Sequence, residues 1–217
     1  MISYLLFDLD GTLSNSQEGI TKCVQYALAA QDIIVTDLSA LTPFIGPPLK
    51  QSFCDFYEMS PAEAERAVAK YRERYEKIGW LENTIYPGIG TMLAELQKKG
   101  FQLAVASSKP KTYVQRILDH FQLSQYFHCI EGSELNGARV DKKDVIAEVL
   151  RQWGNPPVDE LLMIGDRKFD IIGARELGFD CVGVRFGFAD PGELDAHGAI
   201  YIADTVADLH EYLVQLR

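Results

Sequence analysis

The chain contains 217 residues, of which 47% are hydrophobic and 24% are charged, a balance that excludes disordered, collagen-like and disulfide-dense proteins. The length fits one sizeable domain with a smaller companion. The 21 Lys and Arg residues face 31 Asp and Glu residues, so the formal net charge is −10 and nucleic acid and anionic membranes are not expected as partners.

Six short apolar runs, each bounded by turn residues, predict the strands of one sheet. The runs are too short for buried helices, and their continuous apolar character is typical of strands that are covered on both faces. They comprise residues 4–7, 101–106, 127–130, 161–164, 181–184 and, as an edge strand, 199–202.

Helical patterns separate the later strands, at residues 91–99, 111–121, 142–153, 170–177 and 206–216. Strands that alternate with helices at this spacing predict right-handed crossovers, and therefore an α/β fold with a doubly wound parallel sheet. In such sheets the ligand lies beyond the carboxyl ends of the strands. Functional side chains are therefore expected among the residues that directly follow each strand.

Residues 15–82 interrupt the alternation, because they contain three helical stretches and no clear strand. The stretches cover residues 17–30, 49–57 and 61–78. We predict a helical cap domain over residues 15–82, inserted into a core formed by residues 1–14 and 83–217. Its hinges are expected at residues 14–17 and 81–86.

The cysteines and the apolar runs also indicate where the protein resides. Cys23, Cys54, Cys129 and Cys181 are widely separated and form neither a zinc motif nor a disulfide framework. No secretory signal is recognisable at the first strand, and no apolar run approaches the length of a membrane span. We expect a cytoplasmic protein with reduced cysteines.

Two acidic pairs follow two of the predicted strands. Asp8 and Asp10 follow the first strand, and because strand side chains alternate they can face the same way. Asp166 and Asp170 follow the strand at 161–164 and stand four residues apart at a helix start. Paired carboxylates favour a divalent cation such as Mg²⁺. The first pair also fits a plain turn, and the second also suits a helix dipole.

A hydroxyl pair and a lysine pair occupy two further junctions between strands and helices. Ser107 and Ser108 follow the strand at 101–106, where a serine serves either as a helix N-cap or as a phosphate ligand. Lys142 and Lys143 begin the next predicted helix, where positive charge is unfavourable. That cost favours a function for one of the two lysines, and a pair of solvated surface lysines is the alternative.

These four signals occur in a fixed order at successive strand ends, and the chain there resembles the haloacid dehalogenase superfamily over nearly its whole length. The resemblance is carried by D-x-D-G-T at residues 8–12 and G-D-x-x-x-D at residues 165–170. It implies a Rossmann-like core with a helical cap. The cap segment at residues 44–49, F-I-G-P-P-L, resembles a substrate-facing loop of the phosphoglycolate phosphatase-like group.

The resemblance also implies roles for the acidic residues. Asp8 would attack phosphorus and form an aspartyl-phosphate, and Asp10 would act as general acid and base. Mg²⁺ would be held by Asp8, the backbone carbonyl of Asp10 and Asp166, with Asp170 in support. Relatives that release halide lack a carboxylate at the position of Asp10, so its presence favours a phosphate ester or anhydride as substrate.

The phosphoryl group of the substrate would be bound by Ser107 and Lys142. Ser108 could share this contact, and Lys142 matches the family position better than Lys143 by one residue of spacing. Lys109 is a further candidate at the rim of the pocket.

The sequence leaves the substrate and the oligomeric state open. We expect a small phosphorylated metabolite, such as a phosphoglycolate-like monoester. Pyrophosphate, a nucleoside 5′-monophosphate or a sugar phosphate fits the same scaffold, which also supports phosphomutases. A phospho-acceptor switch is the non-enzyme alternative. Monomer and homodimer fit the sequence equally.

Overall fold

The chain divides into two compact units in the computed structural model, which describes residues 1–135 and 139–217. One unit comprises Met1–Ser14 and Ile85–Arg217, and the other comprises Asn15–Thr84. The predicted insertion at residues 15–82 thus lies within the second unit. The chain passes between the units inside two short strands that pair with each other, β2 (Ser14–Asn15) and β3 (Thr84–Ile85).

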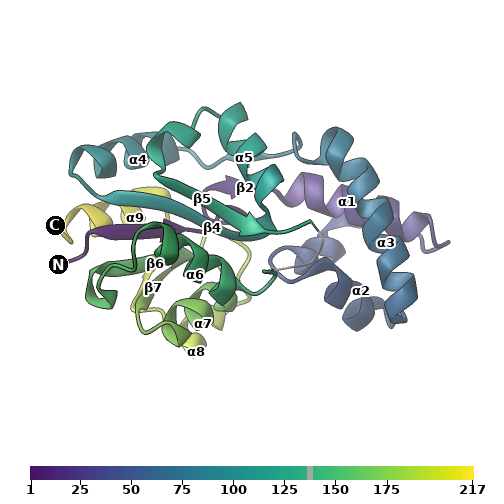
Figure 1. Cartoon of the computed structure of the whole chain (residues 1–217). Helices are drawn as coiled ribbons and strands as arrows, with labels where there is room; N and C mark the ends of the chain where they lie inside the picture. The colour runs from purple at the N-terminus through teal and green to yellow at the C-terminus, as the bar shows by residue number, and fades with distance from the viewer. Residues whose placement is uncertain (136–138) are drawn as a thin grey trace. The chain divides into compact units, whose positions relative to one another are not determined.

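The first unit is built on a six-stranded parallel sheet with the order β5-β4-β1-β6-β7-β8 (Figure 1). The chain winds from β1 to β4 and β5 on one side, and then crosses back to β6, β7 and β8 on the other. The predicted doubly wound α/β fold is therefore confirmed. The strands are β1 (Tyr4–Phe7), β4 (Gln102–Pro110), β5 (Cys129–Ser133), β6 (Leu161–Gly165), β7 (Asp180–Val184) and β8 (Tyr201–Ala203).

Among the described residues, six helices accompany this sheet, and their bounds lie within about three residues of the predicted ones where a helix was predicted. They are α4 (Ile89–Lys98), α5 (Lys111–His120), α6 (Lys142–Gln152), α7 (Lys168–Glu176), α8 (Glu193–His197) and α9 (Val206–Val214). The short helix α8 was not predicted. No helix in the described ranges is both long enough and apolar enough to cross a membrane.

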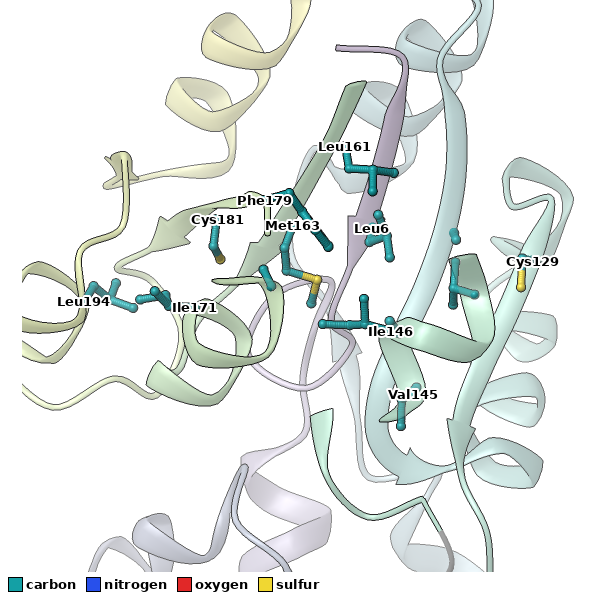
Figure 2. Close-up of a cluster of buried hydrophobic side chains, with 14 residues drawn as sticks. Leu6, Cys129, Val145, Ile146, Leu161, Met163, Ile171, Phe179, Cys181 and Leu194 are labelled. Carbon is teal, nitrogen blue, oxygen red and sulfur yellow. The ribbon is translucent and has the colours of Figure 1, made fainter. Parts of the chain in front are cut away.

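Alternate residues of the strands pack under α6 and α7 and form a continuous apolar cluster (Figure 2). Leu6 of β1 and Met163 of β6 are fully buried, and Ile146 of α6 covers them. Full burial of each such side chain contributes roughly 1.5–3 kcal/mol. This packing holds α6 and α7 against the centre of the sheet. The first turns of these two helices contain the candidate site residues Lys142 and Asp170.

Strand β4 differs most from its prediction, because it continues past residue 106 to Pro110. Its pairing with β5 shifts register between Ser107 and Pro110, where the strand is irregular. Pro110 is the N-cap residue of α5. The alternative that Ser107 or Ser108 caps this helix is therefore wrong, since both serines lie within the strand.

The second unit contains α1 (Gln17–Ala29), α2 (Leu49–Tyr57) and α3 (Pro61–Arg74), together with a 3₁₀ segment at Leu38–Phe44. Helix α3 begins with Ser60 and Glu63 in a reciprocal capping box. It ends earlier than predicted because the chain continues as a π-helical turn at Tyr75–Gly79. The three helical stretches expected at residues 17–30, 49–57 and 61–78 are all present.

Adjacent isoleucines on α7 provide a test of the buried core. Ile171 is 2% exposed and belongs to the apolar cluster, whereas Ile172 is 39% exposed. Ile171→Ala should lower the free energy of unfolding by about 2–4 kcal/mol, because it leaves a cavity. Ile172→Ala should change it by less than about 1 kcal/mol. Equilibrium urea denaturation measures both, and equal losses would contradict the assigned packing.

Candidate active site

The candidate residues come together at the carboxyl edge of the central strands. Asp8 directly follows β1, and its amide donates to the carbonyl of Ile164 in β6 at 2.9 Å. Asp166 directly follows β6, and Lys142 is the first residue of α6. Because β1 pairs with β6, these two strands end side by side. The two acidic motifs that continue from them are therefore neighbours, although they lie far apart in the sequence.

Three of the predicted carboxylates form one buried cluster. Asp8, Asp166 and Asp170 each offer an oxygen atom, and these three atoms lie within 4.8 Å of one another. All three side chains are buried. Neighbouring carboxylates in such surroundings repel each other and lose hydration, so the cluster is unfavourable unless positive charge compensates it.

The cost of this arrangement appears in the pKa values of two of its members. Burial raises the pKa of Asp166 well above its ordinary value, and the charges of Asp8 and Asp170 raise it further. Burial also raises the pKa of Asp170, to about 6, although the charge of Lys142 opposes this. The fold thus holds these groups where protons or a cation are strongly attracted.

Lys142 supplies the positive charge inside the cluster. Its Nζ lies 2.8 Å from Asp8 Oδ1 and 2.8 Å from Asp170 Oδ1, and it donates to the carbonyl of Ala106 at 3.0 Å. Burial by itself lowers the pKa of Lys142, but the two carboxylates outweigh this and hold it above its usual value. The ammonium group therefore stays charged and connects α6 with the ends of β1 and β4.

Lys143, the alternative lysine, points elsewhere. It is exposed, and its Nζ lies 3.3 Å from Glu176 Oε2 on α7. Of the two adjacent lysines, the structure brings Lys142 to the acidic cluster and places Lys143 at the surface.

Asp10 is oriented differently from the three clustered carboxylates. Its two oxygens accept hydrogen bonds from Lys109 Nζ at 2.8 and 2.6 Å, and both side chains are largely buried. Sequence reasoning placed Lys109 at the pocket rim but did not pair it with Asp10. The extension of β4 to Pro110 accounts for this contact, because it carries Lys109 along the strand beside the chain that follows β1.

Ser107 and Ser108 occupy distinct positions at the end of β4. Ser107 is 1% exposed, and its Oγ accepts a hydrogen bond from the amide of Lys109 at 3.3 Å. Ser108 is half-buried, and its carbonyl accepts from the hydroxyl of Ser133 at 2.7 Å. Within β4, Ser107 thus directly follows Ala106, whose carbonyl accepts a hydrogen bond from Lys142.

Two glycines and one amide pack closely around Asp166, and of these only Gly11 belongs to a motif recognised in the sequence. Gly11 has a φ of +85°, and a Cβ there would stand 2.0 Å from Asp166 Oδ2. A Cβ on Gly187 would stand 2.3 Å from Asp166 Cβ. The amide of Phe188 donates to Asp166 Oδ2 at 2.7 Å. The signal was present in the sequence as G-F after a strand, but the contact is visible only in three dimensions.

A groove of about 520 Å³ lies elsewhere on the first unit and contains none of these residues. Its lining includes Leu161, Leu162 and Asp180, which begin β6 and β7. It therefore lies at the amino ends of the strands. Because functional sites in doubly wound sheets lie at the carboxyl ends, we assign the chemistry to the acidic cluster and not to this groove.

Comparisons with known proteins agree with this geometry. The model of the haloacid dehalogenase-like hydrolase family matches residues 5–184. A 5′-nucleotidase of Pseudomonas aeruginosa is 43% identical over 209 residues, which cover 96% of this chain and 94% of that protein. Tyrosine-protein kinase PtkA of Mycobacterium tuberculosis is 37% identical over 96% of this chain and 72% of its own length.

A phosphoglycolate phosphatase of Pseudomonas putida is more distant, with 26% identity over 94% of this chain and 77% of that protein. Among solved structures, a predicted phosphatase from Clostridium acetobutylicum superposes with a TM-score of 0.95 and 44% identity, covering 99% of both chains. The resemblance expected from the two acidic motifs is confirmed. The chain belongs to the haloacid dehalogenase-like hydrolase family, as an enzyme of its phosphatase type.

Proposed function

We propose that the protein is a Mg²⁺-dependent phosphatase that hydrolyses a small phosphate monoester through an aspartyl-phosphate on Asp8. The observation that supports this most strongly is the buried lysine among three buried carboxylates at the end of β1. Phosphoryl transfer depends chiefly on positioning and on neutralising the charge of the transferred group. The cluster suits that reaction because it combines a nucleophile, Asp8, with the positive charge of Lys142 and with carboxylates that can bind a metal ion.

The donor set fits a hard divalent cation. Asp8, Asp166 and Asp170 provide only oxygen atoms, the ligands that Mg²⁺ prefers. Oδ1 of Asp8 and Oδ1 of Asp170 are both buried, and each lies 2.8 Å from Lys142 Nζ. Mg²⁺ bound there by Asp8, Asp166 and the backbone carbonyl of Asp10, with Asp170 in support, would neutralise charge on the phosphoryl oxygens.

In the first step, a carboxylate oxygen of Asp8 forms a bond to phosphorus while the bond from phosphorus to the ester oxygen breaks. Lys142 neutralises negative charge beside the nucleophile. The hydroxyl of Ser107 serves as a donor to the transferring phosphoryl group, with Ser108 as a second donor at the same strand end. The departing oxygen receives a proton from Asp10.

In the second step, water attacks phosphorus and the bond to Asp8 breaks, which releases inorganic phosphate. Asp10 takes the proton of that water and so returns to its acid form. Both oxygens of Asp10 accept hydrogen bonds from Lys109 Nζ, and these two contacts fix the position of the carboxyl group. The reaction is a hydrolysis when water accepts the phosphoryl group from Asp8, and a phosphotransfer when a second substrate accepts it.

The relatives favour a nucleoside 5′-monophosphate over phosphoglycolate as the substrate. The nucleotidase relative shares 43% identity over almost the full length of both chains, against 26% for the phosphoglycolate phosphatase. The second unit, Asn15–Thr84, is the cap in this proposal and selects the organic part of the substrate. Closure of such a domain excludes bulk water from the reaction.

The roles of the first acidic pair predict separate effects. Asp8→Asn should abolish phosphate release, because an amide cannot attack phosphorus. Asp10→Asn should lower kcat by at least about 100-fold, the scale of lost general acid–base catalysis. Steady-state phosphate release measures both. Asp144→Asn, an exposed residue in the first turn of α6, is the control and should retain activity. Turnover by Asp8→Asn would contradict the nucleophile.

The raised pKa values of Asp166 and Asp170 predict pH-dependent metal binding. A metal ion binds the deprotonated carboxylates, so protons compete with it as the pH falls through these values. Mg²⁺ should raise the melting temperature, relative to chelator, more at about pH 8 than at about pH 5, where Asp170 with its pKa of about 6 is protonated. Differential scanning fluorimetry measures this difference. Asp166→Asn should remove the stabilisation, and an equal shift at both pH values would argue against the site.

The comparison of relatives predicts substrate preference. With Mg²⁺, at least one nucleoside 5′-monophosphate should show kcat/KM at least about tenfold above that of 2-phosphoglycolate, a difference of about 1.4 kcal/mol in transition-state binding. Release of inorganic phosphate is the measurement. A preference for phosphoglycolate would overturn the substrate assignment. Phosphate retained on the protein, or on an isomer or tyrosine acceptor, would overturn hydrolysis.

A further inference from the structure

The segment that follows β7 contacts the acidic loop of residues 166–170 at two separate places. At one place the amide of Phe188 donates to Asp166 Oδ2 at 2.7 Å. At the other, Glu193, the first residue of the short helix α8, reaches the start of α7. Asp166 and the first turn of α7 are therefore both held by one segment that lies more than twenty residues further along the chain.

The carboxylate of Glu193 gathers donors from three residues. It accepts from Arg167 Nε at 3.0 Å, from the amide of Lys168 at 2.7 Å and from the amide of Asp190 at 3.4 Å. The side chains of Arg167 and Glu193 are 10% and 6% exposed. Burial by itself raises the pKa of Glu193, but the bonds from Arg167 and Lys168 outweigh it, so that the pKa lies below its ordinary value. The group is a buried, ionised acceptor.

This arrangement constrains the turn between two of the clustered carboxylates. Arg167 stands immediately after Asp166, and its amide donates to Asp170 Oδ2 at 3.1 Å. Lys168 begins α7, whose first amides have no partner within the helix. Glu193 satisfies one of these amides from outside the helix. Its single carboxylate thus fixes both residues that link Asp166 to the helix carrying Asp170.

We propose that Glu193 is a positioning residue for the metal site, acting through Arg167 and Lys168 on the placement of Asp166 and Asp170. The inference rests on the metal site of the proposed function. A buried ion pair often contributes little net stability, because desolvation offsets much of the attraction, and in some proteins such a pair instead specifies one arrangement of the chain. Ligand-orienting groups outside the coordination sphere typically change metal affinity by about 10–100-fold.

The test measures metal binding directly. Mn²⁺ serves as the probe, and its free concentration is followed by electron paramagnetic resonance during titration of the full chain. Glu193→Gln preserves the shape of the side chain but places an amide where the charged acceptor stood. The dissociation constant for Mn²⁺ should rise about tenfold. The Mg²⁺ concentration for half-maximal activity should rise in parallel, and kcat at saturating Mg²⁺ should fall less than the affinity does.

Two controls separate positioning from stability. Leu194→Ala alters the neighbouring residue of α8, which is 2% exposed and packs in the apolar cluster, so it destabilises the fold without removing the carboxylate. Asp204→Asn breaks the exposed pair with Arg185, whose atoms lie 2.7 Å apart. Both variants should bind Mn²⁺ as the unmodified protein does.

Each outcome decides the matter. Unchanged Mn²⁺ affinity in Glu193→Gln overturns the inference, as does equal weakening in Leu194→Ala. If Glu193→Gln does not fold, the paired substitution Arg167→Met with Glu193→Leu replaces the ion pair by apolar groups, and the same weakening is expected from it. Failure of the unmodified protein to bind Mn²⁺ would refute the proposed metal site itself, and not only the contribution of Glu193.

Discussion

The concentration of negative charge at the end of β1 is the constraint on which the rest of the site depends. Three carboxylates cannot remain buried and ionised within a few ångströms of each other without compensation. The fold answers with Lys142, which enters from α6 and contacts two of them. The apolar cluster beneath α6 and α7 holds both helices against the sheet, so the repulsion between the carboxylates does not move them apart.

The same constraint explains why the site is assembled from distant parts of the chain. A single loop that carried all these charges would open into solvent, where the carboxylates regain their hydration. Parallel strands instead deliver one or two charged residues each, and the backbone ladder between β1, β4 and β6 prevents their separation. The free energy gained by packing the core offsets the unfavourable free energy of bringing these charges together.

Much of this arrangement was predictable from sequence. The apolar runs located the strands, and the order of acidic, hydroxyl and lysine residues at their ends identified the family. The preference for Lys142 over Lys143 came from the match to the family position. These inferences succeeded because each depends on local periodicity and on the rule that parallel strands end at one edge.

Other features depend on contacts that no local pattern encodes. The pairing of Lys109 with Asp10 requires the irregular extension of β4, and strand periodicity does not indicate where a strand ends beyond its apolar part. Gly187 and Glu193 follow β7, in a segment for which the sequence analysis identified no functional motif. Their importance arises from three-dimensional closeness to Asp166 and α7, which only the folded chain reveals.

The pairing of β2 with β3 has an architectural consequence. Because these two-residue strands lie side by side, the chain departs from the first unit and re-enters it at adjacent points. A detour between neighbouring points imposes no strain on the sheet, whatever its length. The scaffold of the first unit can therefore accept a longer, shorter or different intervening segment while its own strand ends stay in register.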